Sequence, residues 1–212
     1  MMKFQSSLVF FFFVNLVLPY LCFALFFLVL VVELFMPLFV SLIAPGFVEN
    51  KEKIELAINL TRITFPFLLF ISLSSFFAAI LNSHNKFAAA SAAPIILNLV
   101  LIGILIFGKY LDDELIYFLS YGVSAAGLLQ LIFLYRFVKK FYIINLRFKF
   151  KIDNKVKFFF KKLLPSIFSS GVTQINILVG TIIASFQASA VSYLYYADRI
   201  YQINLAIAGI AI

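Results

Sequence analysis

The chain has 212 residues, of which 64% are hydrophobic and 12% are charged, and its formal net charge is +8. A soluble domain is nearer half apolar and a quarter charged, and so much apolar surface, with 29 Phe residues, would cause aggregation in water. The composition excludes an ordinary soluble domain and predicts an integral membrane protein.

Six apolar segments are long enough to cross a hydrocarbon core of about 30 Å, which needs roughly 20 residues in a helix. Helices are expected because a spanning segment must satisfy its own backbone hydrogen bonds. The predicted fold class is all-α: a polytopic transmembrane helix bundle with six spans. The segments are residues 8–43, 63–81, 88–107, 115–138, 163–187 and 190–212.

The first segment is too long for one perpendicular crossing and too short for two crossings with a turn. It is predicted to be one long tilted helix that ends outside the bilayer, with Pro19 and Pro37 as candidate bends. Pro45 and Gly46 then predict a turn.

Ten Lys and Arg residues lie between positions 136 and 162, against one acid, Asp153. The positive-inside rule places this segment in the cytoplasm. Counting crossings from it places the N-terminus and residues 82–86 on the same side, and the loops 48–55 and 108–114 on the far side. Because the basic loop 139–162 lies between two spans, we expect it to attract anionic membrane lipids, and no nucleic acid.

Catalytic motifs are missing from the sequence: it has no phosphate-binding loop and no HExxH or GxSxG motif. The lone His84 is interpreted as a polar loop residue, and the single Cys22 as a small buried apolar residue. We therefore predict that the chain is not an enzyme and holds no cofactor and no metal.

Asp198 and Arg199 stand in the stretch YLYYADRIYQ inside the last apolar segment. Each costs roughly 2.5 to 3.5 kcal/mol at the centre of an inserting helix. Neighbours in sequence project about 100° apart on a helix, so the two cannot simply neutralise each other. An ionisable residue at this depth is a functional candidate by default, and Arg suits phosphate because its planar fork donates two parallel hydrogen bonds. A structural ion pair with another helix is the alternative.

Other polar groups in the spans are candidates to line a cavity, or in the alternative to bind neighbouring helices. Glu33 lies near the outer end of the first segment and is expected to reach the interface. The cavity-lining candidates are Gln174, Asn176, Tyr195 and Gln202.

The stretch SYLYYADRIYQ resembles the eighth transmembrane helix of the MurJ (MviN) family, the lipid II flippases. Three further stretches support the resemblance in the right order. SLIAPGF is similar to the turn after helix three, RITFPFLLFISLSSFFAAILNSHNKFAAASAAPIILNL to helices four and five, and LLPSIFSSGVTQIN to helix seven. The resemblance covers most of the chain from about residue 37 onward.

The resemblance implies a fragment of a two-lobed exporter fold, that of the multidrug/oligosaccharidyl-lipid/polysaccharide exporters. Residues 1–138 would supply four helices of the N-terminal lobe, 139–162 the basic cytoplasmic loop and 163–212 the first two helices of the C-terminal lobe. Because the matched part runs from helix three into helix eight, we expect a fragment that is inactive alone.

The activity implied by the resemblance is alternating access in the bacterial inner membrane. It would carry lipid II, the undecaprenyl-diphosphate-linked peptidoglycan precursor, from the cytoplasmic to the periplasmic leaflet. Position by position, Arg199 matches the family's cavity arginine, Asp198 the acid beside it, and Ser192 a functionally sensitive serine. These three are the predicted substrate-binding residues.

Two alternatives stay open. The cargo could be another polyprenyl-linked sugar or a cation, or the chain could be a non-transporting membrane scaffold whose charges bind a partner subunit. An Arg199 open to a cavity would favour transport, whereas an Arg199 locked against a carboxylate in a helix interface would favour a scaffold.

Overall fold

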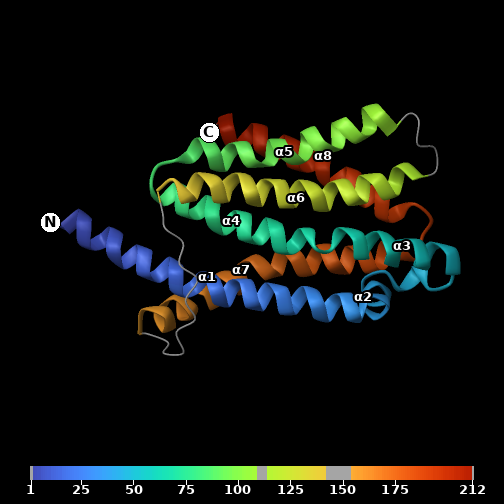
Figure 1. The fold of residues 1–212 in the computed structure, drawn as a ribbon. Helices are drawn as coiled ribbons and strands as arrows, with labels where there is room; N and C mark the ends of the chain where they lie inside the picture. The colour runs from blue at the N-terminus through green and yellow to red at the C-terminus, as the bar shows by residue number, and fades with distance from the viewer. Residues whose placement is uncertain (1, 109–113, 142–153, 212) are drawn as a thin grey trace. The chain divides into compact units, whose positions relative to one another are not determined.

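The described part of the chain, residues 2–108, 114–141 and 154–211 of a computed structural model, is made of helices and contains no strand (Figure 1). This confirms the predicted all-α class. In chain order the elements are α1 (Met2–Leu34), α2 (Met36–Ile43), the short 3-10 helix η1 (Pro45–Phe47), α3 (Lys51–Thr64), α4 (Phe67–Ser83), α5 (Phe87–Phe107), α6 (Leu115–Lys139), α7 (Asn154–Ser185) and α8 (Ala190–Ala211).

Five described stretches are long and apolar enough to cross a membrane, which confirms a polytopic helical chain. Helix α8 has 22 residues but is not among the five, because polar residues such as Asp198, Arg199 and Gln202 lower its mean hydropathy. Its crossing stays a prediction. The five stretches are Val14–Leu34, Lys51–Ser83, Phe87–Phe107, Leu115–Lys139 and Leu164–Ser185.

The first apolar segment is two helices, so the prediction of one long helix over residues 8–43 is wrong at Phe35. That residue leaves helical geometry, with φ −105° and ψ 24°. Pro37 then lies in the first turn of α2, where its missing N–H is tolerated because no intrahelical acceptor is available there. Pro19 remains inside α1. The turn predicted at Pro45 and Gly46 is confirmed as η1.

A second break separates α3 from α4 at Phe65 and Pro66. Pro66 has no N–H to donate, and the hydroxyl of Ser124 in α6 donates to the carbonyl of Ile63 beside the break. Helix α3 begins at Lys51, within the stretch that was predicted to be a loop, and α7 begins at Asn154 rather than at residue 163. Residues 142–153 of the predicted basic loop and 109–113 of the predicted far-side loop lie outside the described residues.

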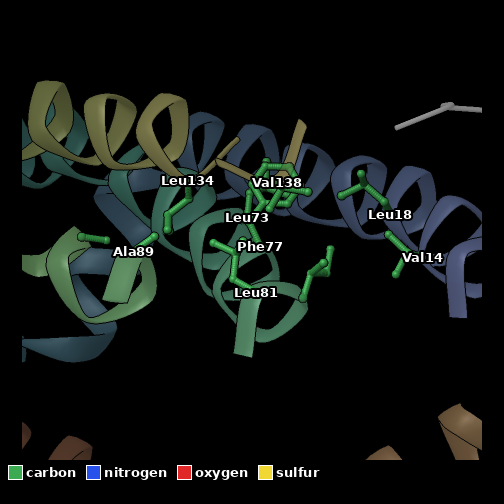
Figure 2. Close-up of a cluster of buried hydrophobic side chains, with 10 residues drawn as sticks. Val14, Leu18, Leu73, Phe77, Leu81, Ala89, Leu134 and Val138 are labelled. Carbon is green, nitrogen blue, oxygen red and sulfur yellow. The ribbon is translucent and has the colours of Figure 1, made fainter. Parts of the chain in front are cut away.

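The chain divides into two compact units. The first combines Met1–Leu34 with Asn59–Phe159, and the second combines Phe35–Ile58 with Phe160–Ile212. In the first unit α6 packs along both α4 and α5 (Figure 1). Figure 2 shows its buried apolar cluster, to which α1, α4, α5 and α6 all contribute: Val14, Leu18, Leu73, Phe77, Leu81, Ala89, Leu134 and Val138.

Most apolar side chains lie outside this cluster. Phe107 is 71% exposed and Phe23 63% exposed, although both lie in stretches long enough to span a membrane. A soluble protein would bury such side chains, so their exposure fits helices whose outer faces are solvated by lipid.

An ion pair joins α1 to α3 within the first unit. Arg62 Nε lies 3.6 Å from Glu33 Oε2, and the two side chains are 49% and 25% exposed. The other carboxylate oxygen of Glu33, Oε1, is buried and has no hydrogen-bond partner. Arg62 is therefore the group that offsets the charge of Glu33.

In the second unit η1 packs against the C-terminal end of α7. The amide of Gly46 donates to Ser185 Oγ over 3.0 Å, and that hydroxyl donates to the carbonyl of Ile182 over 2.7 Å. Ser185 is 2% exposed. A Cβ atom on Gly46 would collide with the backbone carbonyl of Ser185, so this position requires glycine because of close approach.

Replacing Arg62 by Gln should destabilise the chain by about 1 kcal/mol, because Glu33 loses its charged partner while its second oxygen is already unpartnered. This free energy is at the upper end of the range for surface ion pairs, because both side chains are partly exposed. Thermal denaturation in detergent micelles measures the change. The double variant Arg62→Gln/Glu33→Gln should recover most of the loss, and an equal loss in both variants would contradict the pairing.

Replacing Gly46 by Ala should destabilise the chain by about 2 kcal/mol, as expected when a rigid backbone leaves no room for an added methyl group. The matched control is Gly171→Ala in α7, where a Cβ atom would meet nothing within 4 Å. The control should stay within about 1 kcal/mol of wild type, in the stabilising direction, because alanine favours helix. Equal melting temperatures for the two variants would refute the close contact.

Candidate functional site

Four polar residues of α8 form one stripe. Tyr195, Asp198, Arg199 and Gln202 are spaced three and four residues apart, and such residues lie on the same side of a helix. Two pairs are four residues apart, so their side chains can meet on successive turns of the helix: Tyr195 with Arg199, and Asp198 with Gln202. The stripe continues to Ser192, which lies seven residues before Arg199 and thus projects within about 20° of it.

Three contacts connect the stripe. Gln202 Nε2 donates to Asp198 Oδ2 over 2.6 Å, and Arg199 Nη1 donates to Gln202 Oε1 over 3.2 Å. The guanidinium carbon of Arg199 lies 4.9 Å from the ring centre of Tyr195, a cation–π distance. The Gln202 amide thus bridges two charged side chains that project about 100° apart on the helix.

The guanidinium is accessible and has neutral partners. Tyr195, Asp198, Arg199 and Gln202 are all exposed, and within the described ranges Arg199 forms no salt bridge. Arg199 therefore keeps N–H donors that point to no carboxylate, and a planar guanidinium with spare donors can bind a phosphate through two parallel hydrogen bonds.

The α7 candidates are not joined to this stripe. Gln174 and Asn176 are both exposed, and no hydrogen bond links either of them to α8 among the residues that the structure describes. They stand two positions apart in the helix, so their side chains project about 160° from each other. A cavity on one side of α7 would therefore be lined by one of them and not by both.

Sequence reasoning missed two pairings. Gln202 was singled out as a lining residue, but its role as the bridge between Asp198 and Arg199 was not predicted, although its spacing of four and three residues from them is the available signal. Arg62 was not singled out at all. Its signal was an Arg next to an apolar run, which indicates the need for an acidic partner but does not identify Glu33. No group of three or more His, Cys, Asp or Glu side chains able to hold a metal occurs in the described part of the chain.

Comparisons with known proteins agree with the resemblance of the sequence to the MurJ family. The protein-family model described as "Lipid II flippase MurJ" matches residues 10–212. The "Probable lipid II flippase MurJ" of Rickettsia prowazekii (strain Madrid E) is 43% identical over 181 residues, covering 84% of this chain and 35% of its own length. The protein of the same description from Rhizobium tropici is 41% identical over 188 residues, covering 86% of this chain and 35% of its own length.

The chain therefore spans about a third of the length of these curated relatives. A more distant relative, from Helicobacter pylori (strain ATCC 700392 / 26695), is 35% identical over 191 residues. With the family model covering nearly the whole chain and several relatives above 30% identity, the chain belongs to the MurJ family of lipid II flippases.

Proposed function

We propose that this chain is part of a lipid II flippase, and that Arg199 contacts the diphosphate of the lipid-linked cargo. The supporting observation is the exposed guanidinium on α8, held by Tyr195 and Gln202 and not by a carboxylate. The relatives' names support the same cargo, since they are described as probable lipid II flippases. The protein would act as a transporter and not as an enzyme.

The chemistry of binding follows from the Gln202 bridge. A diphosphate offers anionic oxygens in place of the neutral amide oxygen of Gln202, and the planar guanidinium can donate two parallel hydrogen bonds to them. Asp198 accepts from the Gln202 amide and so turns the amide oxygen toward Arg199. Asp198 is thus a positioning residue, and its negative charge also limits how tightly an anionic cargo is held, which suits a carrier that must release it.

The scaffold alternative requires Arg199 to be locked against an acid in a helix interface. The neutral partners and exposure of Arg199 favour the transporter instead. Cargo other than lipid II stays open to test, because none of the contacts described reads a sugar.

We also propose in which membrane the chain lies, how it is oriented there, and which residues belong to each lobe. The chain would lie in the bacterial inner membrane with the N-terminus and residues 139–162 in the cytoplasm, since ten of its 17 basic residues lie between positions 136 and 162. Residues 1–138 would belong to the N-terminal lobe and 163–212 to the C-terminal lobe. The basic segment would be attracted to anionic lipids.

If the α8 stripe lines a water-filled cavity, a thiol placed on it should react with a water-soluble reagent. In the Cys22→Ser background, which removes the single native thiol, Ser192→Cys should react with a charged maleimide at least roughly tenfold faster than Ala197→Cys, because the reacting thiolate forms only where water reaches it. Labelling rates in proteoliposomes measure this.

Ala197 is the control for the opposite side of α8: it is exposed, lies about 7.5 Å from Ser192 along the helix axis, and projects about 160° from Arg199. Equal rates at the two positions would remove the cavity from the proposal, and a faster rate at position 197 would place the water on the opposite face.

Replacing Arg199 by Ala should weaken capture of lipid II by the chain in nanodiscs at least tenfold, because a charge-assisted hydrogen bond is worth about 1.5 to 3 kcal/mol. Arg199→Lys should recover part of the binding, since it keeps the charge but loses the fork. In a chimera whose remaining two thirds come from the Rickettsia prowazekii relative, Arg199→Ala should abolish growth of cells depleted of their own flippase. Growth equal to that of the unmutated chimera would refute the assigned role.

A further inference from the structure

A groove of about 480 Å³ lies within the first unit, and none of its lining residues belongs to the α8 stripe. It is formed by α6, its C-cap residue and one residue of α5, Ile96. Its volume falls in the range of small-molecule sites. The residues from α6 and its C-cap are Leu129, Ile132, Phe133, Arg136, Phe137 and Lys140.

These α6 residues follow a single stripe along the helix. Their spacing from Leu129 to Lys140 is three, one, three, one and three residues, which keeps them on one side. At a rise of 1.5 Å per residue the stripe is about 16 Å long. Half of a hydrocarbon core is about 15 Å, so the groove has the length of one membrane leaflet.

The stripe changes character along its length. Leu129, Ile132 and Phe133 make one end apolar, whereas Arg136 and Lys140 make the other end cationic. Lys140 Nζ lies 5.1 Å from the ring centre of Phe137. An amphipathic ligand with one apolar chain and one anionic head matches this order.

More cations gather at the charged end. Lys86, the N-cap residue of α5, has its Nζ 5.2 Å from the ring centre of Phe141, just after α6. Residues 82–87 and 129–141 contain no Asp or Glu, and in the described ranges Arg136 forms no salt bridge. Among the residues that the structure describes, no acid therefore neutralises the positive charge at this end.

We propose that the groove is a binding site for an anionic glycerophospholipid, with one acyl chain along Leu129, Ile132 and Phe133 and the phosphate on Arg136 and Lys140. Arg136 supplies the planar fork that suits a phosphate, and Lys140 supplies a mobile point charge. The occupant is a lipid of the surrounding leaflet and not the transported cargo, because the site uses no residue of the α8 stripe. The proposal does not rest on the identity of the cargo.

The test is lipid retention by the purified chain, measured by native mass spectrometry after exchange into mixed micelles. Phosphatidylglycerol and phosphatidylcholine with the same acyl chains are offered at equal concentration. The wild type should retain phosphatidylglycerol at least roughly tenfold more than phosphatidylcholine, the tenfold step corresponding to a single charged contact. Arg136→Gln/Lys140→Gln should bring the ratio close to one.

The matched control is Lys51→Gln/Lys53→Gln, which removes the same charge at two exposed positions outside both the groove and the basic segment 139–162. It should keep the wild-type ratio. A second variant, Leu129→Trp, fills the apolar end and leaves both cations in place; Leu129 is 47% exposed and can accept a larger side chain. This variant should lose retention of the long-chain lipid.

Four outcomes would overturn the proposal. Loss of preference in the control pair would mean general charge attraction, and retention by Leu129→Trp would mean that no acyl chain occupies the groove. Displacement of the lipid by inorganic phosphate would indicate a headgroup-only site. Displacement by an equimolar amount of lipid II would make the groove part of the cargo route.

Discussion

The exclusion of charge from hydrocarbon is the constraint on which this molecule depends. Arg199 stands in an apolar segment and cannot be neutralised directly by Asp198, since adjacent helix positions project about 100° apart. The Gln202 amide joins the two, donating to the acid and accepting from the guanidinium. The guanidinium therefore keeps a positive charge that its own helix does not neutralise. The proposed contact with an anionic lipid headgroup follows from this uncompensated charge.

The sequence predicted the membrane class and the approximate positions of the helices, because hydropathy depends on composition alone. It did not predict how the helices break. The chain leaves the helix at Phe35, two residues before Pro37, and Pro66 separates α3 from α4 while Ser124 of α6 donates to the carbonyl of Ile63. That donor lies on a helix remote in sequence, so local patterns could not reveal it. Hydropathy also assigned part of α3 to a loop, since its charged residues mask its helical structure.

The candidate site was predictable in its residues and not in its contacts. A charged pair inside an apolar run identified Asp198 and Arg199, and spacing alone could have identified the Gln202 bridge. The same arithmetic could have shown that Gln174 and Asn176 project to opposite sides of α7. The pairing of Glu33 with Arg62 could not be derived in this way, because it joins residues of separate helices whose packing no single-helix pattern determines.

The contacts of Arg62, Arg136 and Arg199 indicate whether each charge is used within the fold or is available to a ligand. Arg62 lies against the carboxylate of Glu33, so its charge is used within the fold. Arg199 has a tyrosine ring and an amide as partners, and Arg136 opens onto a groove with an apolar wall and a second cation. A positive charge with only neutral or cationic neighbours remains available to an anion, because neutral partners do not cancel its net charge. Because hydropathy counts these arginines alike, only their contacts separate the structural cation from the two that we propose bind a ligand.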